Sequence, residues 1–567
     1  MRIALAPINP TVGDIAGNTR LLEQAVRGAS DADLVVLPEL AICGYPPRDL
    51  LHEPSFVDAC EHAGRSLAGL SRGGPAVVVG CPVRMGPRVR NALLLLRDGA
   101  VERVYAKRLL PTYDVFDEDR YFMPGDEPCV VDVAGHRVGL AICEDLWTGQ
   151  DAGQHWRYEG RADPLAALVD AGAGVIVSPS ASPFVEGKHR RHLALLGGHA
   201  RRHGAWVLSV NQAGANDDLI FDGHALAFDP TGTLRAAGPR FGNAMTVVDL
   251  ARAPAPVHDP LEAAGDDVAL GEALALGVRD YVRKTGFERV LIGLSGGIDS
   301  AVTAALAVMA LGAENVVGVA MPGPYSSDHA LADAKTLADN LGVRLLTLPI
   351  GEPMEGFRGV LDAAFGELGL AALGQRMPDI AQENLQSRLR GTAIMALSNR
   401  LGALVLTTGN KSELAVGYCT LYGDMNGGLA VLADLYKGRV YELARAMNAM
   451  PGAFGFDVSP IPAGTIEKPP SAELAPGQRD DDTLPPYNVL DEIVRWRVEE
   501  RLGVDEIARH MGQEVALVRR ICRLIAANEY KRFQYAVALK VRPVAFGPGR
   551  RMPLAQGWWG DGPTMSP

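Results

Sequence analysis

Residues 290–300 read Val290-Leu-Ile-Gly-Leu-Ser-Gly-Gly-Ile-Asp-Ser300, and a long apolar stretch, 301–311, follows them directly. The pattern predicts a buried strand that enters a glycine turn, with an apolar helix after the turn. The N–H groups of such a turn and of the helix N-terminus form a site for an anion. A Walker A loop is excluded, because no Gly-Lys-Ser/Thr follows at the required spacing. The alternative is a glycine turn with a Ser or Asp helix cap and no ligand.

From residue 268 to residue 407, predicted helices and strands alternate along the chain. We expect helices over 268–284, 300–312, 328–341 and 379–401, and strands over 289–294, 316–320, 343–348 and 403–407. This alternation is typical of an α/β fold with a doubly wound, Rossmann-like parallel sheet. Ligands of such sheets bind at the carboxyl ends of the strands, where Ser295 and Thr408 both lie.

The first half of the chain contains a series of short apolar strands, among them 2–6, 33–37, 76–80, 138–142 and 206–210. Several are apolar throughout, which predicts sheets that are covered on both faces. Residues 251–267 are rich in Pro and Ala and show no clear periodicity, so they predict a linker. The expected organisation is a first domain over 1–250, a linker over 251–267 and a second domain over 268–567.

The composition is that of a folded protein of two or three domains, with 567 residues, of which 47% are hydrophobic and 22% are charged. The formal net charge of −12 argues against broad binding to nucleic acid. The seven cysteines show no disulfide framework, which favours a reducing, cytoplasmic setting. No apolar run reaches membrane-spanning length, and the N-terminal residues predict a strand rather than a signal peptide.

Three residues with chemically useful side chains come just after predicted strands, namely Glu39, Lys107 and Cys143. Taken singly, Cys143 fits a small core residue, and Glu39 and Lys107 fit solvated surface residues. Together with their neighbours, they resemble the carbon–nitrogen hydrolase (nitrilase) superfamily. The matching segments are Leu37-Pro-Glu-Leu-Ala-Ile-Cys-Gly-Tyr-Pro-Pro47, Tyr105-Ala-Lys-Arg-Leu-Leu-Pro-Thr-Tyr113 and Leu140-Ala-Ile-Cys-Glu-Asp-Leu-Trp147.

This resemblance covers about residues 1–250 and implies a four-layer α-β-β-α sandwich that carries a Glu–Lys–Cys triad. Cys143 would attack an amide carbon as a thiolate. Glu39 would take the thiol proton and later hand it to leaving ammonia, and Lys107 would stabilise the oxyanion. Glu118 would be an auxiliary glutamate. The positions that bind glutamine in the family's fused members are matched by Tyr113, Ser182 and Lys188.

The glycine loop resembles the pyrophosphate-binding loop of ligases that split ATP into AMP and pyrophosphate. Segments 382–390, 407–414, 417–425, 468–474, 529–533 and 549–553 resemble NAD⁺ synthetases. With the nitrilase-like half in front, the whole chain resembles the glutamine-dependent NAD⁺ synthetase family. The residues that would contact ATP are Gly293, Leu294, Ser295, Gly296, Gly297, Ile298, Asp299, Ser300 and Thr408.

The same resemblance implies a Mg²⁺ site and a dinucleotide site. Asp299 and Glu413 would hold Mg²⁺, and Asn384, Glu413 and Lys531 would bind deamido-NAD⁺. ATP and a dinucleotide bring several negative charges together, which Mg²⁺ and positioned lysines must offset. We therefore expect a carbon–nitrogen ligase that takes ammonia from glutamine and amidates adenylated deamido-NAD⁺. The expected partners are these small molecules and further copies of the chain in a homo-oligomer, with no nucleic acid and no membrane.

Four features allow other interpretations. Four histidines between residues 189 and 203 suggest a zinc site, although the arginines among them disfavour a cation. Residues 478–486 predict either a lid near the ATP site or a plain loop. Residues 504–525 mimic a helix-turn-helix, but nearby acidic residues favour a packed helical subdomain. The loop and triad also fit an amidotransferase with another substrate, or a regulatory protein with a decayed site.

Overall fold

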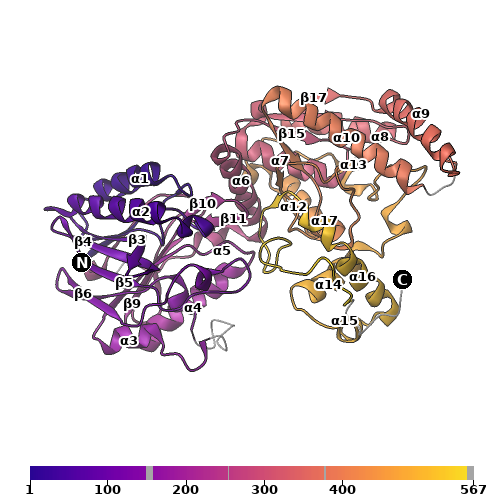
Figure 1. Cartoon of the computed structure of the whole chain (residues 1–567). Coiled ribbons are helices and arrows are strands. Elements are labelled where there is room, and N and C mark those ends of the chain that lie inside the picture. Colours follow the sequence, from indigo (N-terminus) through magenta and orange to yellow (C-terminus); the bar gives the residue numbers. More distant parts are fainter. Residues whose placement is uncertain (149–157, 253–254, 376–378, 559–567) are drawn as a thin grey trace. The chain divides into compact units, whose positions relative to one another are not determined.

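The computed structural model describes residues 1–148, 158–252, 255–375 and 379–558 (Figure 1). The chain divides into two units, Met1–Ala269 and Leu270–Pro567. Residues 253–254 of the expected linker and residues 559–567 of the expected second domain lie outside the described residues.

The apolar strands of the first unit form two six-stranded sheets. The first has the order β14 (Thr246–Asp249), β1 (Arg2–Leu5), β2 (Leu34–Val36), β3 (Ala76–Met85), β4 (Arg88–Arg97) and β5 (Ala100–Ala106). The second has the order β13 (Leu234–Ala237), β12 (Ala225–Phe228), β9 (Trp206–Asn211), β8 (Val175–Ser180), β7 (His136–Leu140) and β6 (Cys129–Val133). A separate hairpin joins β10 (Ala213–Asn216) and β11 (Leu219–Asp222).

These sheets and their helices form four layers, and three apolar clusters lie between the layers. One cluster lies between the two sheets and joins residues such as Leu5 and Val78 to Leu140 and Val177. The opposite face of the first sheet packs against α1 (Ile15–Gly28) and α2 (Pro54–Ser66). The opposite face of the second packs against α3 (Pro164–Asp170) and α4 (Lys188–His203). The predicted α-β-β-α sandwich is therefore confirmed, and its all-apolar strands are explained by burial on both faces.

The second unit contains one parallel sheet. Its order is β17 (Arg344–Thr347), β16 (Val316–Ala320), β15 (Val290–Gly293), β18 (Leu404–Thr407), β19 (Leu429–Ala430) and β20 (Val537–Ala538), and each neighbouring pair is parallel. The doubly wound parallel sheet expected from the alternation is confirmed. The strand order reverses between β15 and β18, and ligands of such sheets bind at this point.

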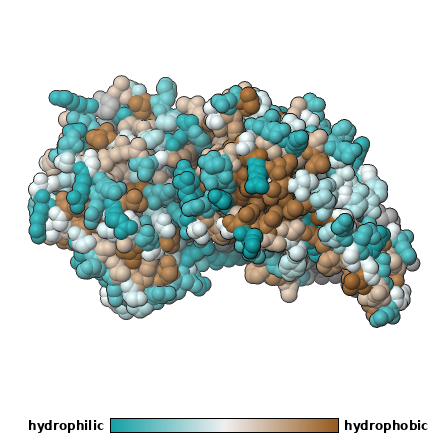
Figure 2. Space-filling model, turned by 90° about the horizontal axis from the view of Figure 1, so that it is seen from above, coloured by the Kyte–Doolittle hydropathy of each residue, from teal (hydrophilic) through white to brown (hydrophobic). Residues whose placement is uncertain are grey.

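Helices before and between these strands are α6 (Asp266–Lys284), α7 (Ile298–Leu311), α8 (Asp328–Leu341), α9 (Gly351–Glu367), α10 (Ile380–Leu401), α11 (Lys411–Val416), α12 (Lys437–Ala449) and α13 (Ala463–Glu467). Helix α9 falls in the gap that the sequence pattern left between two predicted elements. Figure 2 shows hydrophobic surface gathered over the second unit. Exposed apolar side chains on α9 and α10 and between them include Phe357, Val360, Leu368, Leu370 and Ile380.

The C-terminal helices are α14 (Tyr487–Val498), α15 (Val504–Met511), α16 (Val515–Ala527) and α17 (Glu529–Phe533). Helices α15 and α16 contain the segment that mimics a helix-turn-helix. Their apolar residues, such as Ile507 and Ile521, are fully buried in one cluster with Ile493 of α14 and Leu414 of α11. The apolar faces of α15 and α16 therefore pack inside the second unit.

The segment for which we predicted a linker contains regular structure in its described part. Helix α5 (Pro260–Ala264) begins after Asp259, whose carboxylate accepts the N–H of Leu261, and α6 begins at Asp266. Asp259 Oδ1 lies 2.8 Å from Nε2 of His224, and both side chains are buried. Residues 259–264 are therefore folded onto the first unit.

No helix among the residues that the structure describes is both long and apolar enough to cross a membrane.

Candidate active sites

The candidate triad of the first unit is assembled from strand ends of both sheets. Glu39 lies just beyond β2 and Lys107 directly follows β5, whereas Cys143 follows β7 and begins the short helical turn η4 (Cys143–Leu146). The three residues are 1%, 1% and 5% exposed. Because β2 and β5 belong to one sheet and β7 to the other, the site lies between the two sheets.

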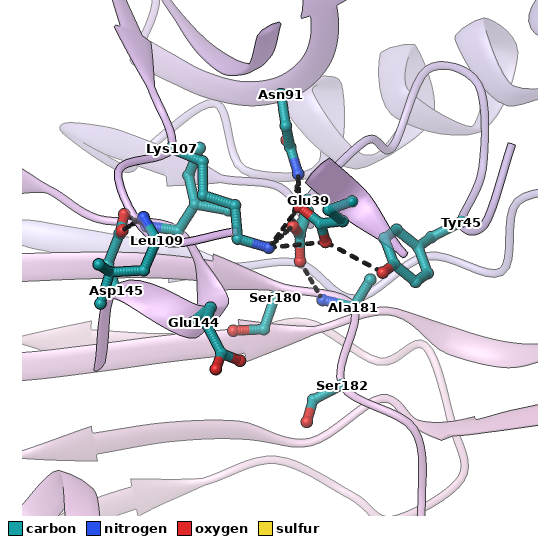
Figure 3. A network of polar contacts seen from close by, with 12 residues as sticks. Glu39, Tyr45, Asn91, Lys107, Leu109, Glu144, Asp145, Ser180, Ala181 and Ser182 are labelled. Atoms are coloured by element: carbon teal, nitrogen blue, oxygen red, sulfur yellow. Dashed lines mark hydrogen bonds and ion pairs between the residues drawn. The ribbon is translucent and has the colours of Figure 1, made fainter. Parts of the chain in front are cut away.

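Lys107 contacts two carboxylates of this site. Its Nζ lies 2.7 Å from Oε1 of Glu39 (Figure 3). It also lies 2.8 and 3.0 Å from the two oxygens of Glu118. Burial acts to lower the pKa of Lys107, but the carboxylates of Glu118 and Glu39 raise it well above its ordinary value. The lysine is therefore held as a cation that faces the site.

Glu39 receives two further hydrogen bonds. Nδ2 of Asn91 donates to Oε1 at 2.7 Å, and the N–H of Ala181, which follows β8 of the other sheet, donates to Oε2 at 2.9 Å. All of these partners donate, which suits an ionised carboxylate. Asn91 is fully buried on β4, and its backbone carbonyl also accepts the N–H of Lys107. Sequence reasoning missed Asn91, because a lone Asn within a strand has no recognisable motif.

Glu118 lies in the short turn Glu118–Arg120 and is 3% exposed. Burial raises its pKa to about 7, against the opposing effect of Lys107. The hydroxyl of Tyr45 donates to its Oε1 at 3.0 Å. Glu118 therefore shares Lys107 with Glu39 and titrates near neutral pH.

Cys143 adopts a backbone φ of +40°, a left-handed conformation that is strained for a residue other than glycine. Burial and the nearby Glu39 carboxylate raise the pKa of the Cys143 thiol well above its ordinary value, although Lys107 acts in the opposite direction. The resting thiol is therefore protonated and needs a base before it can act as a nucleophile.

The three residues expected to bind glutamine make two separate contacts. Nζ of Lys188 donates to Oγ of Ser182 at 2.7 Å, so these two residues lie together. The hydroxyl of Tyr113 instead donates to the carboxylate of Glu144, at 3.0 Å from Oε2. Glu144 directly follows Cys143, so Tyr113 contacts the residue next to Cys143.

The histidine cluster does not form a metal centre in the described part of the chain, where no group of three or more His, Cys, Asp or Glu side chains is arranged to hold a metal. Instead Nε2 of His199 lies 2.7 Å from the carbonyl of Leu146, and the ring of His192 stacks on Trp147.

In the second unit, the quoted glycine loop joins β15 to α7 as predicted. The N–H of Gly297 donates to Oγ of Ser295, and Oγ of Ser300 donates to the carbonyl of Gly297. Gly296 has a φ of +74°, and a Cβ there would lie 2.3 Å from the carbonyl oxygen of Ala330 on α8. The loop therefore needs glycine at this position.

A cavity of about 300 Å³ opens at the carboxyl ends of β15 and β18. Most residues expected to contact ATP line it, namely Gly293, Leu294, Ser295, Gly297, Ile298, Asp299 and Thr408. Asp480 lines the same cavity, so the loop 478–486 borders it. The hydroxyl of Tyr487 donates to Oδ2 of Asp480 at 2.8 Å.

Asp299 and Glu413 both contact the ammonium group of Lys437. Nζ of Lys437, at the start of α12, lies 2.5 Å from Oδ2 of Asp299 and 3.0 Å from Oε1 of Glu413. The side chain of Asn410 donates to Oδ1 of Asp299 and accepts the N–H of Glu413. Burial raises the pKa of Glu413 to about 7, with Lys437 opposing this rise. Two adjacent carboxylates beside a phosphate loop are a donor set that suits Mg²⁺.

Asn384 and Lys531 both contact the segment 417–420. Oδ1 of Asn384 accepts the hydroxyl of Thr420 at 2.9 Å, and Nζ of Lys531 donates to the carbonyls of Gly417 and Cys419 at 2.7 Å. Unlike Glu413, neither residue is among the described residues that line the large cavity. Tyr418 of the segment that they contact does line this cavity. Lys437 was missed because a buried lysine cannot be told from a surface lysine in the sequence.

Comparisons with known proteins match both units. Residues 2–255 match the Carbon-nitrogen hydrolase family and residues 270–535 match the NAD synthase family. Similar relatives include proteins named glutamine-dependent NAD(+) synthetase from Synechocystis sp., 44% identical over 99% of both chains, and from Thermotoga maritima, 39% identical over 98% of both.

Solved structures give the same result. The glutamine-dependent NAD⁺ synthetase from Acinetobacter baumannii, in complex with adenosine diphosphate, is 34% identical, with a TM-score of 0.75 over 99% of both chains. The enzyme from Cytophaga hutchinsonii shares the fold at a TM-score of 0.83 and 23% identity, over 98% of both chains. Because the similarity to curated relatives spans nearly the whole of both chains, this chain belongs to the glutamine-dependent NAD⁺ synthetase family.

Proposed function

We propose that this chain converts deamido-NAD⁺ to NAD⁺, with glutamine as the nitrogen donor and ATP as the source of free energy. The names of its relatives support this activity. The observation that carries the proposal is the buried contact of Lys107 with Glu39 beside the Cys143 thiol, since this arrangement supplies a base, a cation and a nucleophile together.

The first unit would release ammonia from glutamine. Glu39 takes the proton from Sγ of Cys143, and Sγ attacks the amide carbon of the glutamine side chain. Lys107 and the N–H of Glu144 stabilise the oxyanion that forms. The intermediate collapses to a thioester, and Glu39 returns its proton to the leaving ammonia. Water, deprotonated by Glu39, then releases glutamate and the free thiol.

The second unit would activate the nicotinate carboxylate of deamido-NAD⁺. A carboxylate oxygen attacks the α-phosphorus of ATP, and pyrophosphate leaves. Ammonia then attacks the carboxyl carbon of the mixed anhydride, and AMP leaves as NAD⁺ forms. Asp299 and Glu413 would hold Mg²⁺, which supplies positive charge that offsets the phosphates. Lys437 adds a second positive charge at the same place.

The ligand assignments follow the same reasoning. Ser182, Lys188 and Tyr113 would bind the glutamine substrate near Cys143. Residues 293–300 and Thr408 would contact ATP, and Glu413 with Asn384 and Lys531 would contact deamido-NAD⁺. The contacts of Asn384 and Lys531 with segment 417–420 support a shared binding surface for these two residues.

We also propose the domain bounds, the location and the oligomeric state of the enzyme. The division into units at Ala269 and Leu270 supports a synthetase domain from about 268 onward. It extends the glutaminase domain, expected over about 1–250, through the expected linker to about residue 269. The cysteine pattern supports a cytoplasmic location. Exposed apolar side chains such as Phe357 and Val360 support association with further copies of the chain, which light scattering of the purified protein would measure.

The experiment compares glutamine with ammonium as the nitrogen donor, in the presence of deamido-NAD⁺, ATP and Mg²⁺. We expect NAD⁺, AMP and pyrophosphate with either donor, and no NAD⁺ after Mg²⁺ is removed by a chelator. Cys143→Ala should abolish synthesis from glutamine and leave synthesis from ammonium intact. Formation of ADP and phosphate, or loss of both activities in a folded Cys143→Ala variant, would contradict the proposal.

A further inference from the structure

Asp145 is a fully buried carboxylate in the turn that begins with Cys143. It receives four hydrogen bonds. Oδ1 accepts the N–H groups of Arg108 and Leu109, both at 3.0 Å, and Oδ2 accepts the N–H of Ile142 at 2.9 Å and the hydroxyl of Tyr105 at 2.8 Å. None of these partners belongs to the candidate triad, so Asp145 has no direct part in the chemistry described above.

The partners of Asp145 surround two triad residues in the sequence. Tyr105 stands two residues before Lys107, and Arg108 and Leu109 follow it directly, while Ile142 immediately precedes Cys143. Figure 3 shows Asp145 beside Leu109, on the far side of Lys107 from Tyr45. The lysine segment leaves the first sheet and the cysteine segment leaves the second. The carboxylate of Asp145 therefore connects the two segments, one from each sheet, by hydrogen bonds.

The turn that carries Cys143 needs such support. A positive φ at a non-glycine residue is strained and persists only where surrounding contacts fix it. The bond from the Ile142 N–H to Asp145 closes this turn in the manner of a helix cap. All four partners donate hydrogens, and only a carboxylate offers acceptors to all of them. An asparagine would turn its NH₂ group toward one pair of donors.

We propose that Asp145 is a positioning residue of the glutaminase, which sets the Nζ of Lys107 and the Sγ of Cys143 at the mutual spacing that the tetrahedral intermediate requires. This inference rests on the proposed roles of Lys107 and Cys143. It extends the proposed function, because it names the group that aligns the oxyanion-stabilising cation with the nucleophile. A displacement of about 1 Å in such a pair costs on the order of 100-fold in rate.

The test compares Asp145→Asn with Asp229→Asn in the full-length protein. Asp229 is a matched control, since it is a buried loop carboxylate of the same unit whose Oδ1 accepts the N–H groups of Thr231 and Thr233. We expect Asp145→Asn to lower kcat for glutamate release by about 100-fold with little change in KM. Synthesis of NAD⁺ from ammonium should be unchanged, and Asp229→Asn should keep the full glutaminase rate.

Alkylation of Cys143 by iodoacetamide, followed by mass spectrometry of the peptide that carries it, reports the state of the nucleophile. We expect alkylation in Asp145→Asn to slow by at least about 10-fold, because the thiolate loses its aligned cation. Tyr105→Phe removes one of the four bonds and should lower kcat by only about 3- to 10-fold. This milder variant carries the test if Asp145→Asn does not fold.

Unchanged kcat in the folded Asp145→Asn or Tyr105→Phe variants would overturn the inference, as would equal losses in Asp145→Asn and Asp229→Asn. A rise in KM alone would also overturn it, since it would indicate damage to the glutamine pocket instead. Failure of the proposed function has a different signature, because Cys143→Ala would then still make NAD⁺ from glutamine.

Discussion

At the scale of single residues, the buried Lys107 of the glutaminase site contacts two buried carboxylates, Glu39 and Glu118. Lys107 cannot fully compensate both Glu39 and Glu118, so burial keeps the pKa of Glu118 at about 7. An ordinary glutamate has a pKa of about 4.3 in an unfolded chain. The folded protein therefore binds a proton at Glu118 more tightly than the unfolded chain does. The stabilisation from this proton is complete below pH 4.3 and is lost as the pH rises through 7.

We predict that Glu118→Gln removes this pH dependence. The free energy of unfolding of the original protein, relative to that of the variant, should fall by about 2 kcal/mol between pH 5 and pH 8. Urea unfolding at the two pH values measures the difference. Glu23→Gln, which alters a half-exposed residue of α1, serves as the control and should show no such change. A constant difference between original and Glu118→Gln proteins would show that Glu118 is ionised throughout.

Sequence reasoning found the residues that stand in recognisable segments, and the structure places Glu39 in contact with Lys107. It did not single out Asn410, although this residue stands within the recognised segment 407–414, and it missed Asn91 and Lys437 altogether. These side chains reach their carboxylate partners through space, from positions far away in the sequence. Their local patterns are those of ordinary strand, cap and helix residues. Only the folded chain reveals what they contact.

At the scale of elements, the β15–loop–α7 unit depends on one close approach. Gly296→Ala would place a methyl group against the Ala330 carbonyl of α8 and would strain a positive φ. We predict a loss of about 1–3 kcal/mol in unfolding free energy and a severe loss of NAD⁺ synthesis with either nitrogen donor. Gly351→Ala is the control, because a Cβ there meets nothing within 4 Å. Normal activity of Gly296→Ala would refute this role of the loop.

A buried ionic cluster connects α11 to Glu499, the residue that follows α14. Nζ of Lys411 lies 2.8 Å from Asp434 and 2.9 Å from Glu499, and Arg542 lies 3.1 Å from the other oxygen of Glu499. Burial acts to raise the pKa of Glu499, but Lys411 and Arg542 lower it to about 2. The stabilisation from this ionised group is present above its unfolded pKa of about 4.3 and is lost as the pH falls through 2.

We predict that Glu499→Gln makes the second unit less sensitive to acid. The stability advantage of the original protein over this variant should shrink by about 1–2 kcal/mol between pH 6 and pH 3. The exposed Glu492 on the same helix provides the control variant Glu492→Gln. Equal advantages at pH 6 and pH 3 would mean that the cluster does not hold Glu499 ionised.

Long periodic elements were predictable, because each carries its own hydrophobic pattern. The alternation from residue 268 onward was sufficient to predict the parallel sheet, and α10 ends at the residue expected. Strands β19 and β20 were not predictable, since each has two residues and is defined by its pairing, β19 with β18 and β20, and β20 with β19. Helix α5 was also not predictable, because a five-residue helix is too short to show the periodic hydrophobic pattern of a helix.

At the scale of the whole molecule, one chain contains a source of ammonia and a consumer of ammonia. Ammonia released into neutral water becomes mostly ammonium, which lacks the lone pair that attack on the anhydride requires. We predict that ammonia from glutamine reaches the synthetase unit without mixing with the solvent. We also expect glutamate release to be slow until ATP and deamido-NAD⁺ are bound, since free hydrolysis would waste glutamine.

The measurement supplies unlabelled glutamine together with excess ¹⁵N-ammonium and follows the label in NAD⁺. Little ¹⁵N should enter NAD⁺ while glutamine lasts, and Cys143→Ala should give fully labelled NAD⁺ as the control. Free mixing of the label, with glutamate release at full rate in the absence of ATP and deamido-NAD⁺, would rule out both transfer and coupling.

The raised pKa of the Cys143 thiol has a consequence for the durability of the enzyme. Peroxides oxidise thiolates, and a thiol that keeps its proton is a poor target for them. The nucleophile is also 95% shielded from solvent, since only 5% of the residue is exposed. We therefore expect the resting Cys143 thiol of this NAD⁺-forming enzyme to react slowly with peroxides.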